Sequence, residues 1–342
     1  MRERLLDADD AFYPQGIEGL AGRHLQRVLV AAAMQQLWHD VVDDPTVEAA
    51  TRARLRSCAC WGSAHWQQIT SLSPATEMEP HAFVYNLQGR LGAPRSGITL
   101  ATRCIGCNPF SVAVMLANPP CHVGTSATPR LVTQREWLDG VHFDWERGGG
   151  HAVWRHNRVS FVFAKILSKL GYSVKVAEIW VGNAPGPNGK PQRIDGLAKN
   201  AMAGSGVGIG FDATVGSANL RTRLKKAADE GYTTTRQLEK VKTYLKGQPT
   251  KRQNLEFLAV ALDSNSALGE QARDVVQAGY AARLALAKTD GERWAIALEC
   301  QGLLAELSAA VQKGNAAIFF ANARPVAGGF MHAAPVPLDA DR

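Results

Sequence analysis

The sequence has no run of about 18 apolar residues, so it predicts no membrane-spanning helix and no membrane partner. It has only 6 cysteines in 342 residues, which excludes a disulfide framework and favours a reducing, intracellular compartment. The charged start, Met1 to Asp7, does not resemble a secretory signal. Internal repeats and low-complexity tails are also absent. What is left is an ordinary globular composition, long enough for two or three modest domains.

Positive charge is concentrated in one segment. Residues 221 to 252 contain ten lysines and arginines against three acids, a surplus equal to the net charge of +7 of the whole chain. The basic residues are Arg221, Arg223, Lys225, Lys226, Arg236, Lys240, Lys242, Lys246, Lys251 and Arg252. Such a patch suits a phosphate backbone. The alternative is a solvated basic face of a helix.

Hydrophobic spacing predicts a central α/β region. Apolar residues from Val159 to Leu170 recur at helical spacing, with Asn157 as the expected N-cap and Gly171 just beyond the end. Alternating or apolar runs predict strands at 173–181, 193–198, 207–215 and 255–262. We expect helices before residue 60, in the basic segment, and at about 265–288 and 292–312, with a loop-rich segment from 61 to 152.

Three acidic residues fall on successive predicted strands behind this helix: Glu178, Asp195 and Asp212. Asp195 and Asp212 are compatible with a hairpin that brings them side by side. Hydrolysis of a phosphodiester needs a divalent cation, and Mg²⁺ prefers carboxylate oxygens. A lysine commonly orients the attacking water; Thr214 occupies its usual place, so Lys242, or alternatively Lys240, would supply the charge. The competing interpretation is that these acids are solvent-facing strand ends.

The order of short motifs resembles the C-terminal region of non-LTR (LINE-type) retrotransposon polyproteins, in which a cysteine knuckle precedes a restriction-like endonuclease. The similarity covers roughly residues 60 to 320. It rests on Ser63-Ala64-His65-Trp66, the segment Phe83 to Gly92, Cys104-x-x-Cys107, Arg155-His156-Asn157, Gly171 to Val174, Asp212-Ala213-Thr214-Val215, Leu255 to Leu262, and Gln312 to Ala316. No reverse-transcriptase palm signature is visible, which indicates a fragment, a domesticated derivative or a decayed copy.

The resemblance implies an α/β fold with a restriction-endonuclease-like (PD-(D/E)xK-type) core and flanking helical segments. The expected parts are 1–60 (helical), 61–152 (loop-rich, with a degenerate knuckle), 153–262 (endonuclease) and 263–342 (helical). Asp195 and Asp212 would bind Mg²⁺ or Mn²⁺, with Glu178 as an accessory and Lys242 as the family's lysine, beside Tyr244. The protein would be nuclear, with DNA as its partner and RNA as a second candidate.

Cysteines and one basic pair add two further hypotheses. Cys104 and Cys107 have the spacing of half a zinc site, and Cys121 with His122 could complete it, although reduced buried thiols are the alternative. Arg155 and His156, expected just before the helix, could contact a phosphate; the alternative is that they orient the helix.

Together these observations favour a divalent-metal-dependent DNA endonuclease that cuts one strand at a time. Arg155, His156, Arg221, Arg223, Lys225, Lys226 and Lys240 are the expected nucleic-acid contacts. A rival is a catalytically inactive, nucleic-acid-binding remnant of the same family, favoured by the missing knuckle cysteine and the displaced lysine. A purely structural or interaction protein is the third possibility. The sequence does not reveal the target or the oligomeric state.

Overall fold

A computed structural model of the chain describes residues 36, 38–63, 65–68, 75–95, 98, 102–104, 120–121, 130–131, 137–140, 142–143, 150–185, 191–200, 208–217, 223–246 and 255–324. Of the helical segment expected before residue 60, residues 1–35 and 37 lie outside the described residues.

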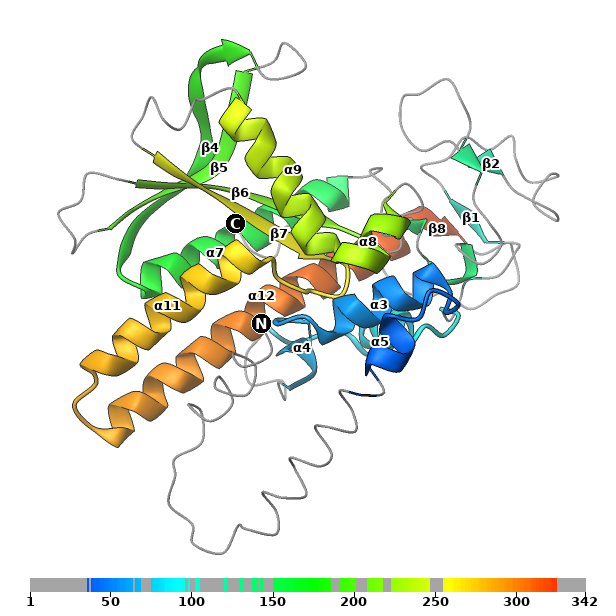
Figure 1. Cartoon of the computed structure of the whole chain (residues 1–342), viewed down its shortest axis with the longest axis horizontal. Coiled ribbons are helices and arrows are strands. Elements are labelled where there is room, and N and C mark those ends of the chain that lie inside the picture. Colours follow the sequence, from blue (N-terminus) through cyan, green and yellow to red (C-terminus); the bar gives the residue numbers. More distant parts are fainter. Residues whose placement is uncertain are drawn as a thin grey trace, which may run out of the picture.

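A four-stranded mixed sheet forms the centre of the described fold (Figure 1). Its strands are β4 (Tyr172–Pro185), β5 (Pro191–Asn200), β6 (Gly208–Gly216) and β7 (Leu255–Asp263), in that spatial order. β5 runs antiparallel to both of its neighbours, whereas β7 is parallel to β6. A parallel neighbour requires a crossover connection, and the basic segment supplies it as α8 (Leu224–Glu230) and α9 (Tyr232–Lys246).

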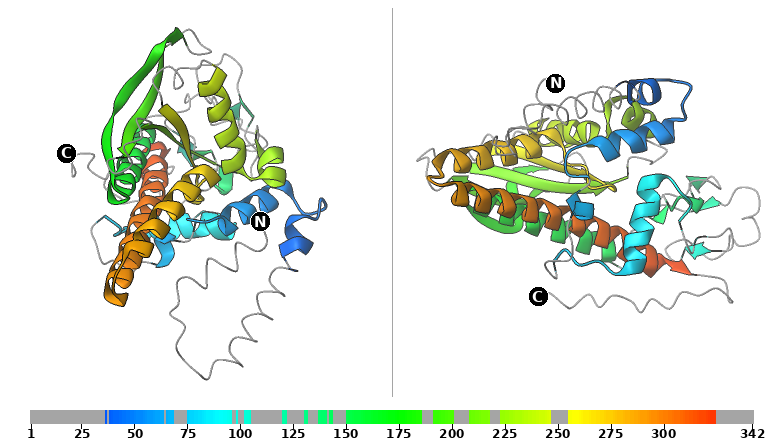
Figure 2. Two further views of the ribbon diagram at one scale, coloured as in Figure 1. Left: turned by 60° about the vertical axis from the view of Figure 1, so that its left-hand side comes forward. Right: turned by 90° about the horizontal axis from the view of Figure 1, so that it is seen from below.

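Two sets of helices cover the two faces of the sheet (Figure 2). On β6, Phe211 and Ala213 belong to the same apolar cluster as α7 (His151–Lys169), and the Phe211 ring meets Phe163 edge-on. Asp212 and Thr214, which alternate with them, contact α9 instead. Because successive side chains of a strand point to opposite faces, α7 and α9 lie on opposite sides of the sheet.

The core also includes the two C-terminal helices, α11 (Glu270–Leu286) and α12 (Asp290–Asn322). α12 begins with a capping box in which the side chains of Thr289 and Glu292 and their backbone N–H groups satisfy one another. It packs along α7, and at Gly314 a Cβ atom would stand 2.3 Å from Cγ of Arg155, so glycine permits this close approach. The apolar core therefore continues across the boundary expected near residue 262.

By length and composition, α12 could also cross a membrane: an 18-residue window reaches a mean hydropathy of 1.3, and 56% of that window is buried inside the protein. The sequence expectation of no such segment overlooked this helix, because charged and polar residues interrupt its apolar content. Burial of its C-terminal half against α7 and other helices gives a sufficient reason for that content.

Smaller elements surround this centre. The described N-terminal helices include α3 (Ala49–Ala59), α4 (His65–Gln68) and α5 (Pro80–Leu91); α3 packs against α8, and α4 and α5 pack against α12. Two short antiparallel pairs are also described, β1 (Arg103–Cys104) with β8 (Ala323–Arg324), and β2 (Pro120–Cys121) with β3 (Arg130–Leu131).

The predicted α/β class is confirmed as a mixed α/β fold, and each of the four predicted strands is present with ends that differ by a few residues. The predicted start of the central helix is wrong. α7 begins at His151 with Gly150 as N-cap, so Asn157 lies inside the helix. Its end agrees, since Gly171 follows the last turn with φ of 92°.

Candidate functional site

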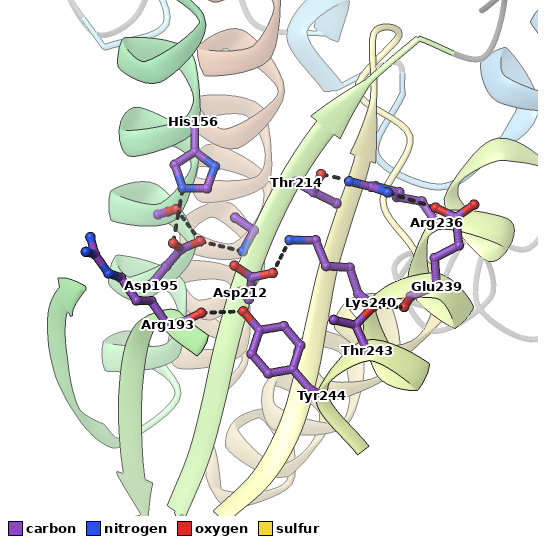
Figure 3. A network of polar contacts seen from close by, with 12 residues as sticks. His156, Arg193, Asp195, Asp212, Thr214, Arg236, Glu239, Lys240, Thr243 and Tyr244 are labelled. Atoms are coloured by element: carbon purple, nitrogen blue, oxygen red, sulfur yellow. Dashed lines mark hydrogen bonds and ion pairs between the residues drawn. The ribbon is translucent and has the colours of Figure 1, made fainter. Parts of the chain in front are cut away.

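Asp195 and Asp212 come together where β5 and β6 separate. The paired residues of these strands end at Gly196 opposite Phe211, and the two aspartates are the next residue on each strand. The backbone N–H of Ala213 points toward β5 and donates to Oδ2 of Asp195 at 2.6 Å. A side chain therefore takes the place of a backbone acceptor, and the two carboxylates lie side by side in the opening (Figure 3).

Asp195 receives its other contacts from α7. Nε2 of His156 lies 3.1 Å from Oδ1, and the hydroxyl of Ser160 donates to Oδ2 at 3.3 Å. Burial opposes ionisation of this carboxyl, but the hydrogen bond from His156, its charge, and the Ala213 N–H outweigh burial and lower the pKa of Asp195. The same hydrogen bond raises the pKa of His156. Asp195 is therefore held as a carboxylate.

Asp212 is buried and forms an ion pair with Lys240 of α9. Burial raises its pKa; the ammonium of Lys240 acts in the opposite direction, while the carboxylate of Asp195 adds to the rise. The two aspartates thus have pKa values moved in opposite directions from the ordinary value. Such divergence is common where two carboxyl groups share one site.

Lys240, and not Lys242, is the lysine at this site. Lys242 is exposed on α9, because two residues along a helix correspond to a rotation of about 200°. Tyr244, four residues after Lys240, lies on the same face, where its ring stacks on Phe257 with centroids 4.1 Å apart. The prediction that Lys242 lies at the site is therefore wrong, because its side chain is on another face of α9.

Tyr244 ties α9 to β5. Its hydroxyl donates to the backbone carbonyl of Arg193, two residues before Asp195. Burial and the charges of Asp212 and Asp195 raise the pKa of Tyr244, so the phenol stays protonated as a donor. This contact holds β5 close to α9 at the point where its pairing with β6 has ended.

α9 runs along β6 in the opposite direction, as a crossover helix does. Lys240 meets Asp212, and one turn earlier Nε of Arg236 donates to the hydroxyl of Thr214 at 3.4 Å. The two spacings match, because four helical residues rise about 6 Å and two strand residues rise about 6.7 Å. Two positive groups of one helix therefore lie over alternate residues of one strand.

The structure separates the roles of Arg155 and His156. Arg155 is only 6% exposed, and its guanidinium donates to Oδ1 of Asn315 on α12. The expected phosphate contact at Arg155 is wrong, because helix packing buries the side chain. His156 is half-exposed and lies at the carboxylates instead of before the helix.

The remaining expected residues are placed only in part. Lys225 and Lys226 are exposed on α8, Arg223 forms an ion pair with Glu239, and Arg221 lies outside the described residues.

Glu178 is in β4 at an irregularity of its pairing with β5; its side chain is not among those described. Cys107 and His122 are likewise outside, and Cys104 and Cys121 belong to different two-stranded sheets. Zinc binding stays a prediction.

Ser160 was not identified from the sequence, and Arg236 was identified only as one residue of the basic segment, although one signal was available. Ser160 is four residues after His156 and Tyr244 is four after Lys240, which is the spacing of residues on one face of a helix. Given the helix and Tyr244, that rule would have selected Lys240. Arg236 follows from the same rule, being four residues before Lys240.

The donor set suits a hard divalent cation in part. Two adjacent carboxylates provide oxygen ligands; Lys240 now pairs with Asp212, and His156 contacts Asp195. Within the described residues, no group of three or more His, Cys, Asp or Glu side chains is placed to hold a metal ion. Water and phosphate oxygens would complete a site of this kind, as they do for Mg²⁺ elsewhere.

No family model matches the chain, and a search of curated proteins finds no match either.

Proposed function

We propose that this protein is a divalent-metal-dependent DNA endonuclease that cuts one strand at a time, with a restriction-endonuclease-like core derived from a non-LTR retrotransposon polyprotein. The observation that carries the proposal is the pair of aspartates in the opening between β5 and β6, with Lys240 bound to Asp212. The order of elements supports the finer fold: one helix, three antiparallel strands, a helical crossover and a parallel fourth strand.

Asp195 and Asp212 would hold Mg²⁺ or Mn²⁺, and Glu178 stays a candidate third ligand. Such an ion activates water and offsets negative charge on the phosphate in the transition state. In the hydrolysis, a water oxygen bonds to phosphorus and the bond from phosphorus to one sugar oxygen breaks. One water proton ends on that sugar oxygen, and the other leaves the new phosphate group to solvent.

Residues of the chain would contribute in distinct ways. Lys240 Nζ, now paired with Asp212, would orient the attacking water and balance charge on the phosphate. His156 and the N–H of Ala213 would keep Asp195 ionised and correctly turned. The exposed lysines Lys225, Lys226 and Lys242 would attract the phosphate backbone, which makes the affinity depend on salt.

Nicking of a supercoiled plasmid tests the proposal. Purified wild-type protein with Mg²⁺ or Mn²⁺ is expected to produce the relaxed circle, and Asp212→Asn, which keeps the side-chain shape, is expected to lower the rate at least about 100-fold. The matched control is Asp274→Asn, an exposed aspartate on α11, which should leave the rate unchanged.

Two outcomes would contradict an endonuclease. Equal nicking by wild type and Asp212→Asn would indicate a contaminating nuclease. Salt-sensitive DNA binding without cleavage by any variant, under either metal, would favour the inactive nucleic-acid-binding remnant.

A further inference from the structure

Glu239 lies between two arginines next to the candidate site. One of its oxygens, Oε2, accepts from Arg236 Nη1 at 2.7 Å and lies 3.2 Å from Arg223 Nη2 (Figure 3 shows the Arg236 contact). Arg223 directly precedes α8, and Arg236 and Glu239 are one turn apart on α9. Two guanidinium groups therefore converge on one carboxylate, and the trio keeps a net positive charge.

The three acids of this basic segment differ in their surroundings. Asp229 pairs with Arg52 of α3, and Glu230 is exposed at the end of α8. Glu239 alone among them bridges two arginines of the crossover. Its side chain is 40% exposed, so its ion pairs are weak ones that an incoming anion can replace at little cost.

The arginine pair lies close to the two aspartates of the candidate site. Arg236 also contacts Thr214, which faces the same side of β6 as Asp212, two residues away. Lys240, the next residue after Glu239, is bound to Asp212. An anion held by Arg223 and Arg236 would therefore be one helical turn from the candidate hydrolytic centre.

We propose that Arg223 and Arg236 form a binding site for one phosphate of the nucleic-acid backbone, and that Glu239 occupies it until the strand binds. Guanidinium groups suit this role, because their paired N–H donors match the two free oxygens of a phosphodiester. Glu239 then acts as a competing carboxylate that weakens binding of the strand. This inference rests on the proposed function for its location, but the binding itself requires no turnover.

Removing the Glu239 carboxylate should increase the affinity for DNA, because Glu239 competes with a phosphate for the two arginines. We would measure fluorescence anisotropy of a labelled 20-nucleotide DNA, single- and double-stranded, in EDTA at several salt concentrations. Glu239→Gln is expected to bind about three- to fivefold more tightly than wild type. Arg236→Gln is expected to bind more weakly, with a salt slope reduced by about one.

Glu230→Gln is the matched control, because it removes the same charge from the same basic segment without touching either arginine. The gain from Glu239→Gln must exceed the gain from Glu230→Gln. The double variant Arg236→Gln/Glu239→Gln must lose most of the gain, since Glu239 acts through the arginines. Urea unfolding of each variant checks that the fold is retained.

An equal effect of Glu239→Gln and Glu230→Gln would overturn the proposal, because net charge alone would then explain the binding. It would also be overturned if Glu239→Gln bound no tighter than wild type, or if neither protein bound DNA. These results are distinct from failure of the endonuclease, which is judged by nicking with a metal present.

Discussion

Asp263, at the end of β7, is a buried acid outside the candidate site, and replacing it with asparagine should stabilise the protein at neutral pH. The side chain is 1% exposed. Its Oδ1 accepts from the backbone N–H groups of Asn265 at 2.8 Å and Ala267 at 3.0 Å. Burial raises its pKa from 3.8 to about 6, despite hydrogen bonds from Ser57 and these N–H groups. Asparagine keeps an acceptor for the loop and carries no charge.

A pKa raised in the folded state means that the acid stabilises the fold most when it is protonated. Its contribution is complete below pH 3.8 and is lost as the pH rises through about 6. The full loss in the free energy of unfolding is about 3 kcal/mol, and about half of this loss has already occurred at pH 5. Wild type should therefore lose roughly 1 to 1.5 kcal/mol relative to Asp263→Asn between pH 5 and pH 8.

Urea unfolding of wild type and Asp263→Asn at pH 5, 6, 7 and 8 measures this difference. The exposed Asp274→Asn serves as the control and should follow wild type at every pH. The opposite result is that Asp263→Asn is less stable than wild type at pH 8 by an amount independent of pH, which would contradict the expected stabilisation. The backbone N–H groups would then hold an ionised carboxylate more strongly than burial opposes it.

Two further predictions test residues whose expected roles the structure changes. Lys240→Met should slow nicking at least about 100-fold, because the positive group at Asp212 is lost, while Lys242→Met should stay within about threefold of wild type; single-turnover assays showing the reverse order would contradict the orientation of α9. Asn315→Ala should cost about 2 kcal/mol in urea unfolding without changing DNA affinity, because it removes an acceptor from the buried guanidinium of Arg155; weaker DNA binding at unchanged stability would make Arg155 a phosphate contact after all.

Local sequence determined the order and type of the central elements. The helical spacing from Val159 to Leu170 marks the side of α7 that faces the core, and the alternation of Ser173 to Val181 is typical of a strand, so the helix and the strand were predictable. Gly171 marked the helix end, because glycine readily adopts the positive φ found there. The presence of Asp195 and Asp212 on neighbouring strands was predictable for the same reason.

Tertiary structure alone decided how the residues of the site meet. Asn157 is a favourable N-cap residue, yet the helix begins six residues earlier, at His151. Arg155 and His156 therefore lie within the helix, where Arg155 hydrogen-bonds to Asn315 of α12 and His156 to Asp195. The point where β5 and β6 separate also depends on partners distant in sequence, since α9 holds the Arg193 carbonyl through Tyr244. Local periodicity specifies which face a side chain occupies. The pairing of Lys240 with Asp212, and of Glu239 with two arginines, depends on how those faces pack together.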